Sequence, residues 1–236
     1  MKICFITGYW NSGTSLLVDL LRRHKEIDLR RARFKPNLEE RDTVKLLRNY
    51  GFDYIDLSND YQWVLENGLD NSWEPKLDSQ KLKTLRADFG KKFSPKDGNW
   101  LLIKNPWWFF FPNFVTELFA EDELRTICIF RDGKDQVVSK DYWLRDTNRP
   151  EAKLMARARF WNLCMSYYKE QWKGREKHLD LRYEALCADA NPSIAKCMDL
   201  PSLRNKKWED LDPKLKEEVL EIVSPGQAII DEYIPD

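Results

Sequence analysis

The sequence has no excess of charge of either sign, because its 236 residues include 39 Lys and Arg against 39 Asp and Glu. This balance argues against a general binder of nucleic acid or of membrane surfaces. No apolar run reaches the length that a membrane-spanning helix needs. The first expected strand begins at residue 2, which leaves no room for a signal peptide. We therefore expect a cytoplasmic protein with no nucleic-acid or membrane partner.

Cysteine and histidine are also scarce. The chain has five Cys and two His, and no two cysteines form a C-x-x-C pair. An odd and dispersed set of cysteines is typical of reduced thiols in a cytosolic protein and not of a disulfide scaffold or a zinc site. No group of carboxylates and histidines has the spacing of metal ligands, so we expect no metal.

A glycine-bounded segment near the N-terminus, Gly8–Ser15, lies between an apolar run and an apolar-periodic run. This order predicts a strand, a phosphate-binding turn and a helix. Gly8 and Gly13 allow a tight turn and a close approach to an anion, and the N-terminus of the helix favours phosphate. The spacing is that of a nucleoside triphosphate P-loop, but Thr14 stands where such a loop has its lysine.

Two further segments follow along the chain. Arg131 ends a β-branched run, and Ser139 lies eight residues later in an expected helix. A guanidinium can form two parallel bonds to a phosphate, and a serine on the following helix can donate to the same group. The third segment is Leu-Arg-Tyr-Glu-Ala-Leu at 181–186, which contains Tyr183.

These three segments, in this order, resemble motifs of the sulfotransferases that use 3′-phosphoadenosine 5′-phosphosulfate (PAPS) and release 3′-phosphoadenosine 5′-phosphate (PAP). The resemblance implies that Arg131 and Ser139 bind the 3′-phosphate, with Tyr183 near the adenosine. Gly133 stands where the family usually has proline. The residues implied to hold the 5′-phosphosulfate are Ser12, Gly13, Thr14 and Ser15.

Strands that alternate with helices predict an α/β fold, with a central parallel sheet flanked by helices and the ligand at the carboxyl ends of the strands. We expect one P-loop kinase-like domain over residues 1–236, with a mostly helical insert at about 37–92. Expected strands lie near 3–6, 100–104, 125–130 and 178–181. Expected helices lie at about 14–24, 133–144, 151–173, 191–199 and 213–223, and the helix at 151–173 has the clearest amphipathic pattern, which predicts a buried stripe.

Catalysis of sulfuryl transfer needs a cation near the bridging oxygen and a base for the acceptor proton. Family members commonly carry lysine or arginine where this chain has Asn11, which can donate only a neutral hydrogen bond. Lys104 is the candidate to compensate, and the alternative is a surface lysine. Asp19 occupies the position of the base in the heparan-type enzymes, and the alternative is an exposed helix aspartate. The two histidines, His24 and His178, both look structural.

Aromatic residues are concentrated after the expected strand at 100–104, in Trp107-Trp108-Phe109-Phe110-Phe111. Consecutive aromatics cannot all face a core from one element, so Trp107 and Trp108 are candidates to bind the acceptor. The alternative is a hydrophobic plug. Glu74, in a Trp-Glu-Pro turn, is a further candidate at the acceptor.

The leading functional hypothesis is therefore transfer of a sulfuryl group from PAPS to a hydroxyl or amine of a small-molecule or carbohydrate acceptor. Asn11 and the missing catalytic histidine favour one alternative, a protein that binds PAP or PAPS but has degraded catalysis. An ATP-dependent kinase is a third hypothesis, which has to explain the absent P-loop lysine.

Overall fold

In the computed structural model of the chain, the described residues are 1–21, 25–28, 43, 45–51, 64–66, 68–69, 74–95, 99–139, 150–189 and 211–233. The chain divides into two compact units. The first unit comprises Met1–Ile55, Asp70–Cys128 and Gly174–Leu179, and the second comprises Asp56–Leu69, Ile129–Lys173 and Asp180–Asp236. The expectation of one domain over 1–236 stays a prediction.

The strands form a sheet in the order β2-β3-β1-β4-β5. Their bounds are Lys2–Thr7 (β1), Ile27–Asp28 (β2), Trp100–Lys104 (β3), Glu123–Phe130 (β4) and His178–Arg182 (β5). Strand β1 is parallel to both β3 and β4, and β2 is parallel to β3, which confirms the predicted parallel α/β fold. The sequence did not predict β2, because two residues are too few for a periodic pattern.

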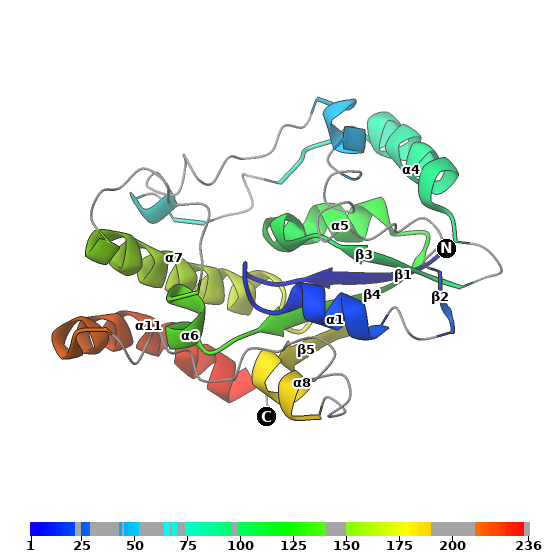
Figure 1. The fold of residues 1–236 in the computed structure, drawn as a ribbon. Coiled ribbons are helices and arrows are strands. Elements are labelled where there is room, and N and C mark those ends of the chain that lie inside the picture. Colours follow the sequence, from blue (N-terminus) through cyan, green and yellow to red (C-terminus); the bar gives the residue numbers. More distant parts are fainter. Residues whose placement is uncertain are drawn as a thin grey trace. The chain divides into compact units, whose positions relative to one another are not determined.

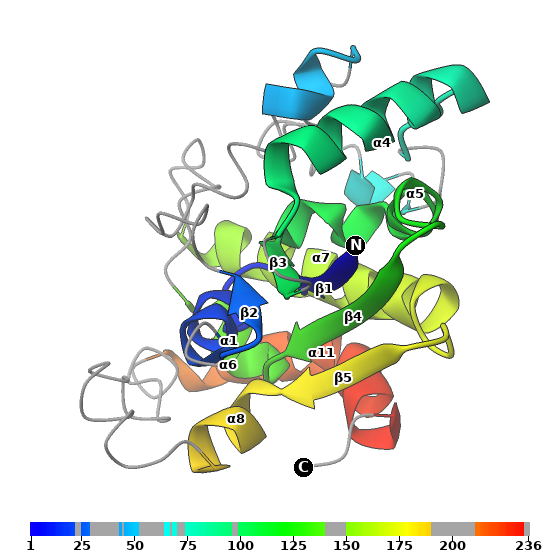
Figure 2. The ribbon, with the colours of Figure 1, turned by 90° about the vertical axis from the view of Figure 1, so that its right-hand side faces the viewer.

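The first unit places helices on both faces of its strands. These elements are α1 (Thr14–Leu21), α4 (Ser79–Phe93), the 3₁₀ helix η2 (Pro106–Phe110) and α5 (Pro112–Leu118). Helix α1 packs on β1 and β3, and α5 lies on the opposite face of the strands (Figure 1, Figure 2). On the α5 face, Phe5 of β1 stacks on Trp108 with ring centroids 5.7 Å apart. The turn at Gly8–Ser15 therefore joins a buried strand to a packed helix.

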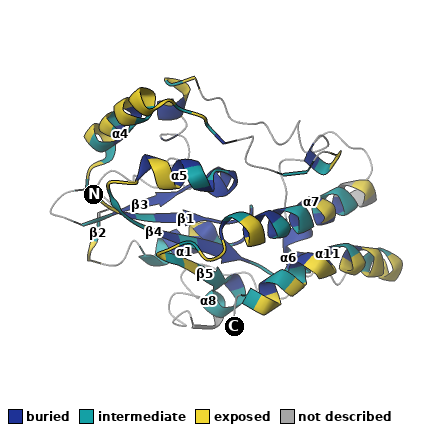
Figure 3. Cartoon of the chain, turned by 180° about the vertical axis from the view of Figure 1, so that it is seen from behind, coloured by how far each residue is buried: buried dark blue, intermediate teal, exposed yellow. Residues whose placement is uncertain are grey.

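The expected helical insert is described only in part. Helix α4 matches the helix predicted within 37–92, and the carboxylate of Asp78 caps it by accepting from the backbone N–H of Lys81. One side of α4 is exposed, whereas Leu85 and Phe89 are buried (Figure 3). The described residues of this region contain no strand, and several stretches of it lie outside the described residues.

The second unit is built mainly from helices. They are α6 (Gly133–Val137), α7 (Pro150–Gln171), α8 (Tyr183–Asp189) and α11 (Pro213–Tyr233), and α7 packs against both α6 and α11. The stripe predicted along α7 is confirmed as core, since all its members are buried: Leu154, Ala158, Trp161, Met165, Tyr168 and Trp172. Helix α6 ends earlier than expected, and the helix expected near 191–199 lies outside the described residues.

Trp161 explains why two glycines are needed in the second unit. A Cβ atom on Gly133 would lie 2.7 Å from the Trp161 ring, and a Cβ atom on Gly226 of α11 would lie equally close. The indole Nε1 donates to Gln136 Oε1 at 2.9 Å, which fixes the ring in place. Gly133 is therefore required by packing, in a position where sulfotransferases usually have proline.

Among the described helices, none has the length and apolarity to cross a membrane.

Candidate active site

The turn after β1 has an unusual backbone that the sequence explains. Gly8, Asn11 and Gly13 have φ values of 147°, 62° and 103°. The Ser12 N–H donates to the Tyr9 carbonyl at 3.2 Å, which closes a turn whose third residue is Asn11. A positive φ at this turn position favours glycine or asparagine over other residues. The backbone thus gives a physical reason for asparagine at position 11.

Helix α1 begins directly after this turn, and Leu17 N–H donates to the Gly13 carbonyl at 3.1 Å. The Ser12 side chain is 0% exposed, and its hydroxyl has no hydrogen-bond partner among the described residues. Thr14 is also buried, whereas Ser15 is exposed. A buried hydroxyl without a partner is unfavourable unless a ligand supplies one. The turn has the donors and the helix N-terminus that an anion requires.

The ends of β1 and β3 are held together beside this turn. Thr7 Oγ1 donates to the Asn105 carbonyl at 3.1 Å, and Asn105 N–H donates to the Ile6 carbonyl at 3.0 Å. In the sheet register Lys104 pairs with Ile6, two residues before Gly8. Lys104 is only 7% exposed, which differs from the surface lysine considered as its alternative. Its catalytic role stays a prediction.

A cluster of aromatic side chains from the turn and from η2 packs beside the turn. The Trp10 ring centroid lies 5.0 Å from that of Trp107 and 5.7 Å from that of Phe110. Asn105 Oδ1 caps η2 by accepting from the Trp107 N–H at 3.0 Å. Trp108 is 1% exposed and packs in the core. The burial of Trp107 and Trp108 agrees with the alternative that this segment is a hydrophobic plug. Their roles at the acceptor stay predictions.

Glu74 is placed at the N-terminus of α5. Its Oε1 accepts from the backbone and side-chain nitrogens of Asn113, and its Oε2 accepts from the Phe114 N–H at 2.8 Å. Burial raises the pKa of Glu74 above its ordinary value, while the hydrogen bonds from Asn113 and Phe114 oppose that rise. These bonds explain why a carboxyl group is buried here, because it caps the N-terminus of α5. Its role at the acceptor stays a prediction.

The other candidates of the first unit are titratable groups on α1 and β5. Asp19 lies on α1 and is partly buried, and its role as base stays a prediction. His178 Nδ1 lies 2.6 Å from Thr126 Oγ1, in agreement with a structural role. His178 also belongs to the one group of potential metal ligands in the described part of the chain. The expectation of no metal stays a prediction. The other histidine, His24, lies outside the described residues.

In the second unit, Arg131 and Tyr183 lie in contact, and their roles at the nucleotide stay predictions. Arg131 follows β4, and its guanidinium lies over the Tyr183 ring at 4.9 Å. The Arg131 Nε is buried and has no hydrogen-bond partner among the described residues. Burial, with a hydrogen bond to Cys187, raises the pKa of Tyr183 to about 12, so the phenol stays protonated near neutral pH. The pair offers a cation and an aromatic face.

The backbone amides at the start of α6 are already hydrogen bonded. Asp132 N–H donates to Glu184 Oε1 at 3.1 Å, and Gly133 N–H donates to Gln227 Oε1 at 3.1 Å. The Asp132 carboxylate accepts from the Lys134 N–H at 3.0 Å. Burial and the neighbouring Asp132 raise the pKa of Asp135. Binding of an anion here therefore depends on side chains.

Ser139, after α6, is the third predicted residue of the second unit. Its hydroxyl donates to the Gln136 carbonyl at 2.6 Å, so it must turn away from that carbonyl to donate to a phosphate. Arg157 Nη1 donates to the Ser139 carbonyl at 3.0 Å. No sequence motif indicates Arg157. The sequence feature that could have indicated Arg157 is its position directly before Ala158, a member of the buried stripe of α7.

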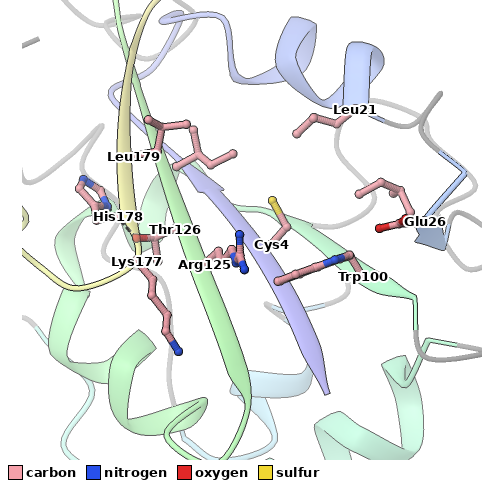
Figure 4. A pocket seen from close by; sticks show the side chains of 11 residues that line it. Cys4, Leu21, Glu26, Trp100, Arg125, Thr126, Lys177, His178 and Leu179 are labelled. Carbon is pink, nitrogen blue, oxygen red and sulfur yellow. Dashed lines mark hydrogen bonds between the residues drawn. The ribbon is translucent and has the colours of Figure 1, made fainter.

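A cavity of about 690 Å³ lies elsewhere in the first unit (Figure 4). Its walls include Cys4, on the face of β1 opposite Phe5, and Trp100, whose ring lies 5.1 Å from the Arg125 guanidinium. Burial raises the pKa of the Cys4 thiol to about 11, so this thiol is no nucleophile near neutral pH. The cavity lies over the first residues of β3 and not beside the turn that follows β1.

The comparisons with known proteins bear on the family and the fold. A sequence profile described as the sulfotransferase family matches residues 4–203. The solved sulfotransferase domain from the curacin biosynthetic pathway is 14% identical, with 98% of this chain and 96% of that chain covered and a TM-score of 0.51. The sulfotransferase domain from the Synechococcus PCC 7002 olefin synthase is 14% identical, with 100% and 95% covered and a TM-score of 0.51. Both show the fold. No curated protein sequence matches the chain.

Proposed function

The chain belongs to the sulfotransferase family, and on this basis we propose that it transfers a sulfuryl group from PAPS to an acceptor. The acceptor is a hydroxyl or amine of a small molecule or carbohydrate, and the reaction is an in-line displacement that leaves PAP. A cytoplasmic location is part of the proposal. The free thiols of the four described cysteines are those expected in a reducing compartment.

The single observation that carries the proposal is the buried hydroxyl of Ser12. This hydroxyl has no hydrogen-bond partner among the described residues, and it lies in a turn with positive φ at the N-terminus of α1. A phosphate oxygen would satisfy it. The same turn lacks the P-loop lysine, which favours a phosphosulfate over a triphosphate. The residues present therefore fit the 5′ end of PAPS.

When bound, PAPS supplies the sulfuryl group, and the chain supplies positioning and electrostatic stabilisation. Ser12, Thr14 and Ser15 donate hydrogen bonds to the 5′-phosphate, together with the backbone of the turn. Lys104 provides positive charge at the carboxyl edge of β3, and Asn11 donates a neutral hydrogen bond. Asp19 accepts the proton of the acceptor.

The residues that follow β4 and β5 bind the 3′-phosphoadenosine part of the nucleotide in this proposal. Arg131 and Ser139 hold the 3′-phosphate, and Tyr183 lies by the adenosine. The support is the Arg131 guanidinium, which stacks on Tyr183 and keeps a buried Nε without a partner among the described residues. Charge-assisted bonds from a guanidinium are about twice as strong as neutral ones, so Arg131 contributes most of the selectivity for the 3′-phosphate.

The test has two stages, binding and turnover. Thermal shift should show stronger protection by PAP than by ADP, and stronger protection by ADP would instead favour an ATP-dependent kinase. PAP release from PAPS is then measured against sugars, phenols and amines. Asp19→Asn should lower turnover while the affinity for PAP is unchanged, and an unchanged rate would remove Asp19 as the base.

Asn11 favours a second candidate function, a protein that binds PAP or PAPS with degraded catalysis. The residue is neutral where related enzymes carry a cation, and its left-handed backbone disfavours most replacements. This alternative predicts PAP binding without turnover for every acceptor offered. Turnover by the wild-type protein with any acceptor would rule it out.

A further inference from the structure

Helix α7 covers α6 with one face. Trp161 packs on Gly133 and bonds to Gln136, so it lies over α6 itself. Arg157 is four residues earlier on α7, which places it on the same face one turn away. There it reaches the end of α6 and donates through Nη1 to the Ser139 carbonyl at 3.0 Å. Arg157 is thus held beside a residue assigned to the 3′-phosphate.

The Arg157 guanidinium is incompletely satisfied. Its Nε is buried and has no hydrogen-bond partner in the part of the chain that the structure describes. Arg131 shows the same feature at the other end of α6, and no other arginine among the described residues does. A buried cationic donor without an acceptor is costly, and a bound anion would supply the missing acceptor. Two such donors flank one short helix.

We propose that Arg157 is a further ligand of the 3′-phosphate, acting with Arg131 and Ser139. This inference rests on the proposed function. The amides of Asp132 and Gly133 already donate to Glu184 and Gln227, so α6 offers these donors to no ligand. A phosphate at this place therefore depends on guanidinium groups, which match its geometry with two parallel bonds. Arg157 supplies the second guanidinium.

The experiment compares two nucleotides that differ only in the 3′-phosphate, PAP and adenosine 5′-phosphate, by calorimetry on the full chain. Arg157→Ala should weaken PAP binding roughly tenfold to a hundredfold, the loss of a charge-assisted bond. The affinity for adenosine 5′-phosphate should be unchanged. The matched control is Arg159→Ala, because Arg159 is an exposed arginine two residues away on the same helix. It should bind both nucleotides as the wild type does.

A second variant keeps the inference testable if Arg157→Ala does not fold. Arg157→Gln keeps a donor for the Ser139 carbonyl but removes the charge, and it should lose the preference for PAP to a similar extent. An equal loss for both nucleotides would mean that Arg157 only supports the fold, and a preserved preference for PAP would also overturn the inference. If the wild type itself shows no preference for PAP, the proposed function fails, and this inference fails with it.

Discussion

The turn after β1 and the turn after β4 both connect a strand to a helix. They differ in the hydrogen-bond donors that they could offer to an anion. In the first, Gly8, Asn11 and Gly13 have positive φ values, and the buried Ser12 hydroxyl lacks a partner among the described residues. In the second, Glu184 and Gln227 already accept from the first amides. The first turn relies on backbone and hydroxyl donors, and the second relies on guanidinium groups.

This difference teaches how each turn discriminates between ligands. Neutral donors that converge on a helix N-terminus bind an oxyanion by shape and proximity, whereas guanidinium groups add a full charge. The first turn should therefore tolerate loss of one hydroxyl, and the second should be sensitive to loss of one charge.

The largest expected effect is at the second turn. Arg131→Ala should weaken PAP binding by about 1.5 to 3 kcal/mol, because a charge-assisted hydrogen bond to the 3′-phosphate is lost. Calorimetry with PAP measures the change. The matched control is Arg125→Ala, since Arg125 is an exposed arginine of β4 with no part in the proposal. Unchanged affinity in Arg131→Ala would remove this residue from the site and abolish the contrast between the turns.

Gly133→Ala tests the packing that supports the second turn. The new Cβ would lie 2.7 Å from the buried Trp161 ring, and such overpacking typically costs about 1 to 3 kcal/mol of the free energy of unfolding. Denaturant unfolding measures it. Gly90→Ala is the matched control, because its Cβ would meet only Ser94 Oγ at 4.0 Å, and alanine in a helix should stabilise α4 by roughly 0.5 to 1 kcal/mol. Equal effects in the two variants would contradict the packing argument.

Trp10→Ala tests the support of the first turn. It removes ring contacts to Trp107 and Phe110, and an aromatic pair is worth about 0.5 to 1.5 kcal/mol beyond buried area. We expect faster hydrogen exchange of the backbone amides at 8–14 and weaker PAP binding. Trp100→Ala is the control, since Trp100 begins β3, at the end of that strand away from η2, and its loss should leave exchange at the turn unchanged. Unaltered exchange in Trp10→Ala would show that the cluster does not hold the turn.

Ser12→Ala should separate binding from folding at the first turn. Removing a buried hydroxyl without a partner among the described residues should leave the unliganded protein as stable as the wild type or slightly more stable. PAP binding should weaken by about 0.5 to 1.5 kcal/mol, the worth of one neutral hydrogen bond. Thermal unfolding without ligand and calorimetry with PAP measure the two quantities. A large loss of stability would mean that the hydroxyl has a structural partner.

The smallest effect is expected for Asp135→Asn. The pKa of Asp135 is raised in the fold, so the protonated form is favoured there, and its contribution to stability falls as pH rises through the raised pKa. The variant should lose this part of the pH dependence. It also removes a negative charge near Arg131, so PAP should bind slightly more tightly at neutral pH. Unfolding measured from about pH 4 to about pH 7, the range in which a carboxyl group of raised pKa titrates, tests the sign. A stability profile like that of the wild type would contradict it.

Much of the fold could be predicted from the sequence because its signals are local. The strand at 100–104 and the stripe of α7 follow from apolar periodicity, and the turn at Gly8–Ser15 follows from glycine spacing. The candidate site residues were indicated only by contiguous motifs, and their roles stay predictions. Glu74 was assigned to the acceptor because its neighbours are aromatic, but its hydrogen-bond partners lie on α5, about 40 residues along the chain.

By itself, the sequence determined the strands β1, β3, β4 and β5, the glycine-bounded turn at Gly8–Ser15 and the face of α7 that is buried. These depend on residue spacing and backbone preference within a few positions. Only the tertiary structure decided that the Ser12 hydroxyl lacks a partner among the described residues, that Gly133 lies under Trp161 and that Arg157 reaches Ser139. The reason is physical: whether a polar group is satisfied depends on atoms that packing brings together from distant parts of the chain.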